Sequence, residues 1–111
     1  MSELPIETDV ATVAARLDRN DPLLLLDVRE EDEYATARIE GSKLIPMSQL
    51  GNRAGELDAY RETLIVVHCH HGIRSLQVTH ALRNHGFAKV QSMSGGIDQW
   101  SLLVDPEVPR Y

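Results

Sequence analysis

The fold is indicated most directly by residues 63–75, which read Thr63-Leu64-Ile65-Val66-Val67-His68 and then Cys69-His70-His71-Gly72-Ile73-Arg74-Ser75. The first part is apolar and rich in β-branched residues, as in a strand buried on both faces. The second part, named here the cysteine loop, contains glycine and polar residues and leads into a helical pattern over 75–85. A buried strand followed by a loop and a helix is typical of α/β sheets.

The same alternation of strands and helices extends through the rest of the chain. Strands are predicted at 23–28, 43–46 and 89–93, and helices at 10–17 and 97–103, with Thr8 or Asp9 as the first N-cap. A weaker helical pattern covers 48–60, where Gly51 and Gly55 interrupt it. We expect Val78, Ala81 and Leu82 to face inward from the helix at 75–85.

Length and composition narrow the class of protein. The 111 residues allow a single domain, 1–111, and 42% hydrophobic residues provide a core. Seventeen acidic against 11 basic residues give a net charge of −6, which argues against nucleic-acid and anionic-membrane partners. The longest apolar run, 23–26, is too short to span a membrane, and residues 1–5 do not resemble a signal peptide. We therefore expect a cytoplasmic protein.

The cysteine loop carries the chemistry. A loop at the carboxyl end of a strand can turn its backbone N–H groups inward, and the helix that follows adds its positive end. A thiol at Cys69 is stabilised there as a thiolate, which is a nucleophile. Arg74 offers a permanent charge and a planar fork for an oxyanion, and Gly72 lets the backbone turn.

Less specific interpretations compete with this one. A lone cysteine is often an inert buried residue, but Cys69 opens a loop that holds glycine and arginine. The five histidines, His68, His70, His71, His80 and His85, invite a metal site, but one cysteine and no neighbouring carboxylate argue against it, so no metal is expected. His68 simply ends a strand in this interpretation. The acidic run Glu30–Glu33 is interpreted as a solvated helix face.

Four motifs in order along the chain resemble the rhodanese family of sulfurtransferases in its single-domain form. They are Leu26-Asp27-Val28-Arg29-Glu30 with Glu33-Tyr34, the segment Arg38–Pro46, the cysteine loop, and Gly95-Gly96-Ile97-Asp98-Gln99-Trp100. Two positions depart from the family's pattern: Arg38 stands where histidine is common and Ser42 where alanine is common. Both are secondary positions and concern substrate detail.

The resemblance implies a three-layer α/β fold with a central, mostly parallel, five-stranded sheet flanked by helices. It implies that Cys69 is the nucleophile and carries sulfur as a persulfide, with no cofactor. The loop residues His70, His71, Gly72, Ile73, Arg74 and Ser75 would then bind substrate, and Asp27 and Arg29 would support the loop from beneath. A donor such as thiosulfate and an acceptor such as cyanide or a thiol are implied, and an acceptor protein stays open.

Two alternative functions are weighed against this reading. A cysteine phosphatase or arsenate reductase has five residues between cysteine and arginine, whereas four separate Cys69 from Arg74 here. A sulfur-relay or regulatory module on the same fold would bind a partner protein, with turnover of free thiosulfate incidental. The roles of His70 and His71 stay open between donors to a leaving sulfite and exposed loop residues.

Overall fold

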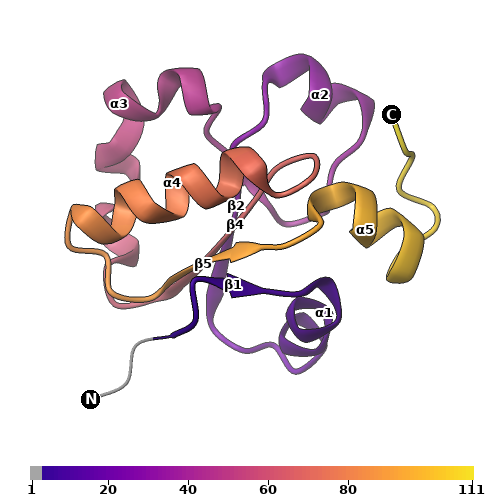
Figure 1. The fold of residues 1–111 in the computed structure, drawn as a ribbon, viewed down its shortest axis with the longest axis horizontal. Helices are drawn as coiled ribbons and strands as arrows, with labels where there is room; N and C mark the ends of the chain where they lie inside the picture. The colour runs from indigo at the N-terminus through magenta and orange to yellow at the C-terminus, as the bar shows by residue number, and fades with distance from the viewer. Residues whose placement is uncertain (1–3) are drawn as a thin grey trace.

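The central feature of the fold is a five-stranded sheet in the order β1-β5-β4-β2-β3, with every neighbouring pair parallel (Figure 1). The computed structural model describes residues 4–111. Residues 1–3, on which part of the signal-peptide prediction rests, lie outside the described residues. The predicted α/β fold with a parallel, five-stranded sheet is confirmed.

Helices and strands alternate along the chain. The strands are β1 Glu7–Thr8, β2 Leu23–Asp27, β3 Lys43–Leu44, β4 Leu64–His68 and β5 Val90–Met93. The α-helices are α1 Val10–Asp18, α2 Glu31–Thr36, α3 Leu50–Arg53, α4 Ile73–Asn84 and α5 Gly96–Leu103, with 3-10 turns η1 Met47–Gln49 and η2 Ala54–Tyr60. Among the described residues, no helix has both the length and the apolar character needed to cross a membrane.

The two apolar runs of the sequence form the middle of the sheet. β2 and β4 pair along their whole length, from Leu23 opposite Leu64 to Asp27 opposite His68. Both strands are buried almost throughout, as expected for parallel strands covered on both faces. Because they run in the same direction, the segments that follow Asp27 and His68 leave the sheet at the same edge.

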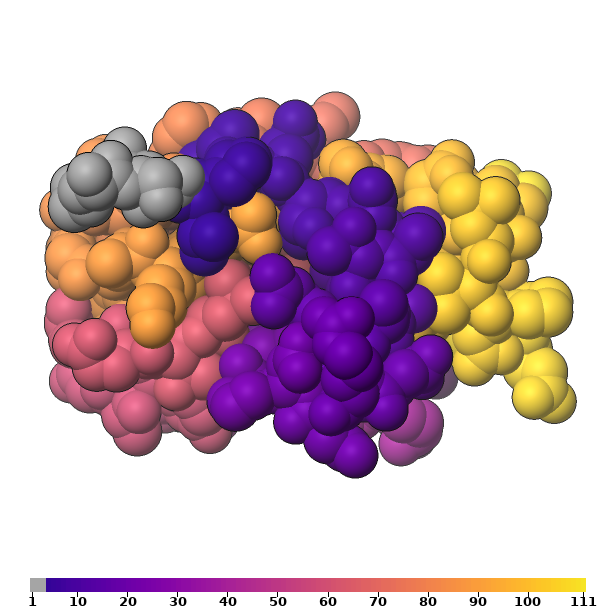
Figure 2. Space-filling model, turned by 90° about the horizontal axis from the view of Figure 1, so that it is seen from below, coloured from indigo at the N-terminus to yellow at the C-terminus, as the bar shows by residue number. Residues whose placement is uncertain are grey.

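Helices cover the sheet on both faces. Val78 and Leu82 of α4 and Leu57 of η2 pack on one face, together with Leu26 and Val67 of the sheet. On the other face, α1 and α5 bury Val10, Val13, Ile97 and Trp100 against Leu25 and Val66. Figure 2 shows this second face, with the indigo and purple α1 segment next to the yellow C-terminal segment.

Two predictions about helices need correction. The stretch 48–60 forms 3-10 turns around the four-residue α3, and Leu57 is its buried anchor. The helix predicted at 75–85 is α4, which begins earlier, at Ile73. Ala81 of this helix is exposed and does not face inward, whereas Thr79 is fully buried. Thr79 tolerates burial because its hydroxyl donates to the carbonyl oxygen of Ser75 at 2.8 Å.

His68 ends β4, as predicted, but it is also fully buried. Neither ring nitrogen finds a hydrogen-bond partner among residues 4–111. Burial lowers the pKa of His68 from 6.5 to about 4, although the Asp27 carboxylate partly opposes this. The imidazole is therefore neutral at physiological pH, and a proton on it would be costly.

We expect acid to destabilise the protein through His68. The folded protein binds this proton less readily than the unfolded chain, so stability is lost as pH falls from 6.5 towards 4, by roughly 1.4 kcal/mol per unit of pKa shift. Chemical denaturation at a series of pH values measures the loss. His68→Leu, an apolar control, should show a smaller decrease over this interval; an equal decrease in both proteins would contradict the prediction.

Candidate active site

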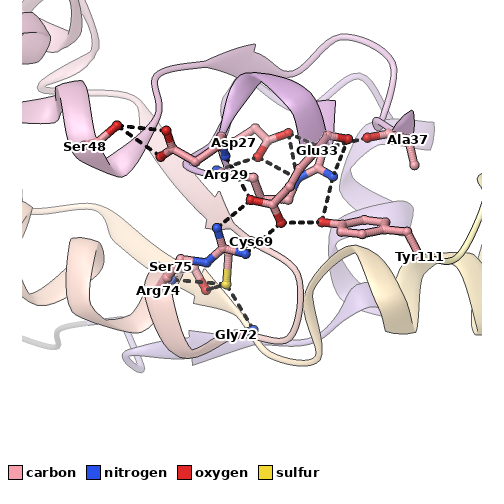
Figure 3. A network of polar contacts seen from close by, with 11 residues as sticks. Asp27, Arg29, Glu33, Ala37, Ser48, Cys69, Gly72, Arg74, Ser75 and Tyr111 are labelled. Atoms are coloured by element: carbon pink, nitrogen blue, oxygen red, sulfur yellow. Dashed lines mark hydrogen bonds and ion pairs between the residues drawn. The ribbon is translucent and has the colours of Figure 1, made fainter. Parts of the chain in front are cut away.

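Cys69 follows β4 directly and lies at the bottom of the cysteine loop (Figure 3). Its sulfur accepts hydrogen bonds from the backbone N–H groups of Gly72, at 3.1 Å, and Ser75, at 3.3 Å. The residue is only 1% exposed. The sequence-based expectation of inward backbone donors is thus confirmed for these two residues, whose N–H groups point at the sulfur.

The Gly95-Gly96 turn holds the cysteine loop in place. A Cβ on Gly96 would lie 2.4 Å from the carbonyl oxygens of both Cys69 and His70, and Gly96 has a φ of +59°. The start of α5 then donates to the same two carbonyls, from Ile97 N–H at 2.9 Å and Asp98 N–H at 3.2 Å. These contacts explain physically why residue 96 of the turn is a glycine.

A chain of hydroxyl groups extends from the thiol into the protein. The Cys69 sulfur lies 3.4 Å from Ser75 Oγ, which is 2.8 Å from Ser92 Oγ. Both serines are fully buried. A hydroxyl can rotate to donate or accept, so Ser75 can also donate to a sulfur anion while it exchanges a hydrogen bond with Ser92. Ser92 was missed from the sequence, because a single serine within a strand carries no motif.

Arg74 does not offer a free fork. Its Nη1 and Nη2 donate to the two carboxylate oxygens of Glu33 at 2.7 and 2.9 Å (Figure 3). Hydrogen bonds from Arg74, and then from the backbone N–H of Glu30, lower the pKa of Glu33 to about 2 despite partial burial. The interpretation of Glu30–Glu33 as a solvated helix face is therefore wrong for Glu33, which α2 turns towards the loop.

Tyr111 joins this group from the far end of the described chain. Its hydroxyl donates to Glu33 Oε2 at 2.9 Å and accepts from Arg29 Nη1 at 3.0 Å. Its ring stacks on His70, which stacks on His71, with ring centroids 4.0 Å apart in each pair. Burial, with a further effect of the Glu33 carboxylate, raises the pKa of Tyr111 to about 12. No motif in the sequence pointed to Tyr111.

Asp27 and Arg29 form a fully buried ion pair with an N–O distance of 2.6 Å. Arg29 also donates to the carbonyl oxygens of Ala37, at 2.8 Å, and Glu33, at 3.3 Å. Within residues 4–111, neither side chain has a hydrogen bond to the cysteine loop. The expected support from beneath is therefore indirect, through Tyr111 and through the pairing of β2 with β4.

The other loop residues face different surroundings. His71 is largely exposed, and its Nδ1 lies 3.9 Å from Asp98 Oδ2. Burial, and then the neighbouring His71, lower the pKa of His70 below its ordinary value, which favours the neutral imidazole. The side chain of Ile73 is 73% exposed. In the described part of the chain, no group of three or more histidine, cysteine, aspartate or glutamate side chains comes together as a metal site.

We expect Gly96→Ala to disrupt the cysteine loop. The new Cβ would clash with the carbonyls of Cys69 and His70, and we expect a loss of stability of roughly 1–3 kcal/mol beyond the backbone strain. Gly41→Ala is the matched control, since Gly41 also has a positive φ, +85°, but has nothing within 4 Å of its Cβ position. Denaturation and the rate of Cys69 alkylation measure both variants. Equal effects of the two substitutions would contradict the proposed contact.

The fold and the buried, hydrogen-bonded thiol define an α/β domain with a cysteine loop at the carboxyl edge of its sheet. The model of the Rhodanese-like domain family matches residues 9–103 of the chain. This match covers most of the chain, and the protein therefore belongs to the rhodanese-like family.

Curated relatives agree with this assignment. The chain is 38% identical over 95 residues to the Rhodanese-like/PpiC domain-containing protein 12, chloroplastic, of Arabidopsis thaliana, covering 82% of this chain and 31% of that protein. It is 34% identical over 100 residues to the putative sulfur carrier protein YrkF of Bacillus subtilis, covering 90% of this chain and 52% of that protein. The chain thus spans about a third to a half of the length of these two relatives.

Solved structures show the same fold. A rhodanese-related protein from Thermoplasma volcanium has a TM-score of 0.81 and 27% identity, covering 96% of this chain and all of that chain. A thiosulfate sulfurtransferase from Pseudomonas aeruginosa has a TM-score of 0.77 and 32% identity, covering 86% of this chain and 18% of that chain.

Proposed function

We propose that this protein is a sulfurtransferase that moves a sulfane sulfur from a donor such as thiosulfate to a thiophilic acceptor, through a persulfide on Cys69. The observation that carries the proposal is the pair of backbone donors, Gly72 N–H and Ser75 N–H, aimed at the Cys69 sulfur. Backbone donors that are already in place stabilise sulfur anions without a reorganisation of the site.

In the first step, the Cys69 thiolate attacks the outer sulfur of the donor. The new bond joins Cys69 Sγ to this sulfur, the sulfur–sulfur bond of thiosulfate breaks, and its electron pair leaves with sulfite. Cys69 is then an anionic persulfide. No general base is needed if the cysteine is already ionised, and the hydroxyl of Ser75, 3.4 Å from Sγ, can donate to the anion.

In the second step, a thiophilic acceptor attacks the terminal sulfur of the persulfide. With cyanide, the carbon–sulfur bond of thiocyanate forms, the persulfide bond breaks, and its electrons return to Cys69 as a thiolate. The loop packs closely around Cys69, which is 1% exposed. This close packing favours the transfer of a single atom over the transfer of a larger group.

The relatives support sulfur chemistry at this level. The Bacillus subtilis relative is named a putative sulfur carrier protein, and one of the solved structures is named a thiosulfate sulfurtransferase. Their names describe proteins longer than this chain, so the donor and acceptor assigned here are part of the proposal.

A protein acceptor is the second candidate, and one observation favours it. Ile73 presents an apolar side chain, 73% exposed, at the start of α4 and within the loop that holds Cys69. A protein that docks over the loop to reach the Cys69 persulfide would cover this side chain. Sulfur relay to a partner would use the same Cys69 persulfide.

Sulfur loading of Cys69 tests the proposal directly. Incubation with excess thiosulfate should raise the intact mass by one sulfur atom, and cyanide should remove this atom and form thiocyanate. Cys69→Ser should do neither, because Cys69 is the single cysteine of the chain. A mass increase in the serine variant, or none in the wild-type protein with any sulfane-sulfur donor, would contradict the proposed function.

We expect no useful hydrolysis of an aryl phosphate by the wild-type protein. A phosphoryl group in transfer needs donors for three equatorial oxygens, whereas two backbone N–H groups of the short loop point at the Cys69 sulfur and Arg74 is bound to Glu33. Release of p-nitrophenol from p-nitrophenyl phosphate is measured beside thiocyanate formation from thiosulfate. Hydrolysis without sulfur transfer would favour the phosphatase alternative.

A further inference from the structure

The charges around the cysteine loop are arranged in neutral pairs. Arg74 is bound to Glu33, Arg110 to Asp98 at 2.9 Å, and Arg29 to Asp27 at 2.6 Å. Each arginine beside the loop thus has its own carboxylate. Within residues 4–111, the arginines that a small oxyanion would meet near Cys69 are thus already bound to carboxylates.

Glu33 is the carboxylate that balances the positive charge of Arg74 next to the thiol. Figure 3 shows the guanidinium of Arg74 between the Cys69 sulfur and the Glu33 carboxylate. The carboxylate is fixed from three sides, because Arg74, the backbone N–H of Glu30 and the hydroxyl of Tyr111 all donate to it. With a pKa of about 2, Glu33 keeps its negative charge throughout the physiological pH range.

On the α2 side of the loop, the groups next to Glu33 do not add a positive charge. Burial lowers the pKa of His70, which favours its neutral form. Glu31 and Asp32 are exposed in the first turn of α2, beside Glu33, and add two negative charges. The α2 side of the loop is therefore neutral to negative, and such a potential repels a dianion more strongly than a singly charged molecule.

We propose that Glu33 is a specificity-determining residue that selects sulfur donors carrying at most one negative charge, such as organic persulfides or thiosulfonates, over the thiosulfate dianion. This inference rests on the proposed function. The chemistry of loading is unchanged: the Cys69 thiolate attacks the outer sulfur, the sulfur–sulfur bond breaks, and a thiolate or a sulfinate leaves in place of sulfite.

Two donors separate charge from reactivity. Methanethiosulfonate and thiosulfate both present a sulfur bonded to a sulfonyl sulfur, but the first is a monoanion and the second a dianion. The wild-type protein should load sulfur from methanethiosulfonate with the higher kcat/KM. In Glu33→Gln the ratio of the two kcat/KM values should shift towards thiosulfate by roughly tenfold, as one close charge at a partly exposed site would give.

Control variants separate this effect from loss of structure. Glu31→Gln removes one charge from the same turn of α2 without touching Arg74, and should leave the ratio within roughly twofold of wild type, because exposed charges are screened. Glu33→Asp keeps the charge and should keep the wild-type preference. If Glu33 only positioned Arg74, Glu33→Gln would lower both kcat/KM values together and leave their ratio unchanged.

The outcomes are distinguishable from failure of the proposed function. If neither donor adds a sulfur atom to Cys69 by intact mass, the proposed function itself fails. If both donors load Cys69 but Glu33→Gln leaves the ratio unchanged, or shifts it away from thiosulfate, the selection by Glu33 is overturned. The selection by Glu33 is supported if Glu33→Gln shifts the ratio of kcat/KM values towards thiosulfate and if rising salt makes this shift smaller.

Discussion

The buried ion pair of Asp27 and Arg29 joins parts of the chain that are far apart in sequence. Asp27 ends β2, and its carboxylate accepts from Arg29 Nε, Nη2 and the backbone N–H. The remaining Arg29 donors reach the carbonyls of Ala37 and Glu33 and the hydroxyl of Tyr111. Replacing such a pair with apolar residues is often tolerated, but removal of one partner costs about 3–5 kcal/mol. Its value here lies in fixing where α2 and the C-terminal segment lie.

From this pair, the order of the site follows step by step. Fixing α2 directs Glu33 towards the cysteine loop, and Glu33 then holds Arg74 at the start of α4. On the opposite side, α5 holds the Cys69 and His70 carbonyls with backbone N–H groups. The loop is thus held between a network of side chains on one side and a network of backbone groups on the other. The thiol between them makes its contacts with backbone donors and one hydroxyl.

The sequence was informative where the signal was local. Apolar runs predicted β2 and β4, and the combination of cysteine, glycine and arginine predicted the loop and its inward N–H groups. Glu33 was misinterpreted because α2 has only six residues and its acidic start is already explained by the helix dipole. Tyr111 gave no signal at all, because only the tertiary fold brings it to His70. Thr79 was overlooked because its burial depends on a hydrogen bond that composition does not reveal.

The backbone network and the side-chain network around the loop differ in how much they depend on the identity of the side chains. Backbone donors are present whatever the side chains are, so the Gly72 and Ser75 N–H groups stabilise any sulfur anion on Cys69 in the same way. The charge beside the cysteine loop comes from side chains, and the electrostatic effect of an arginine there depends on the carboxylate that binds it. The arginine in this loop therefore cannot be interpreted as an anion clamp from its position alone. With Glu33 2.7 Å away, Arg74 is bound to a carboxylate of α2, and this carboxylate balances its charge.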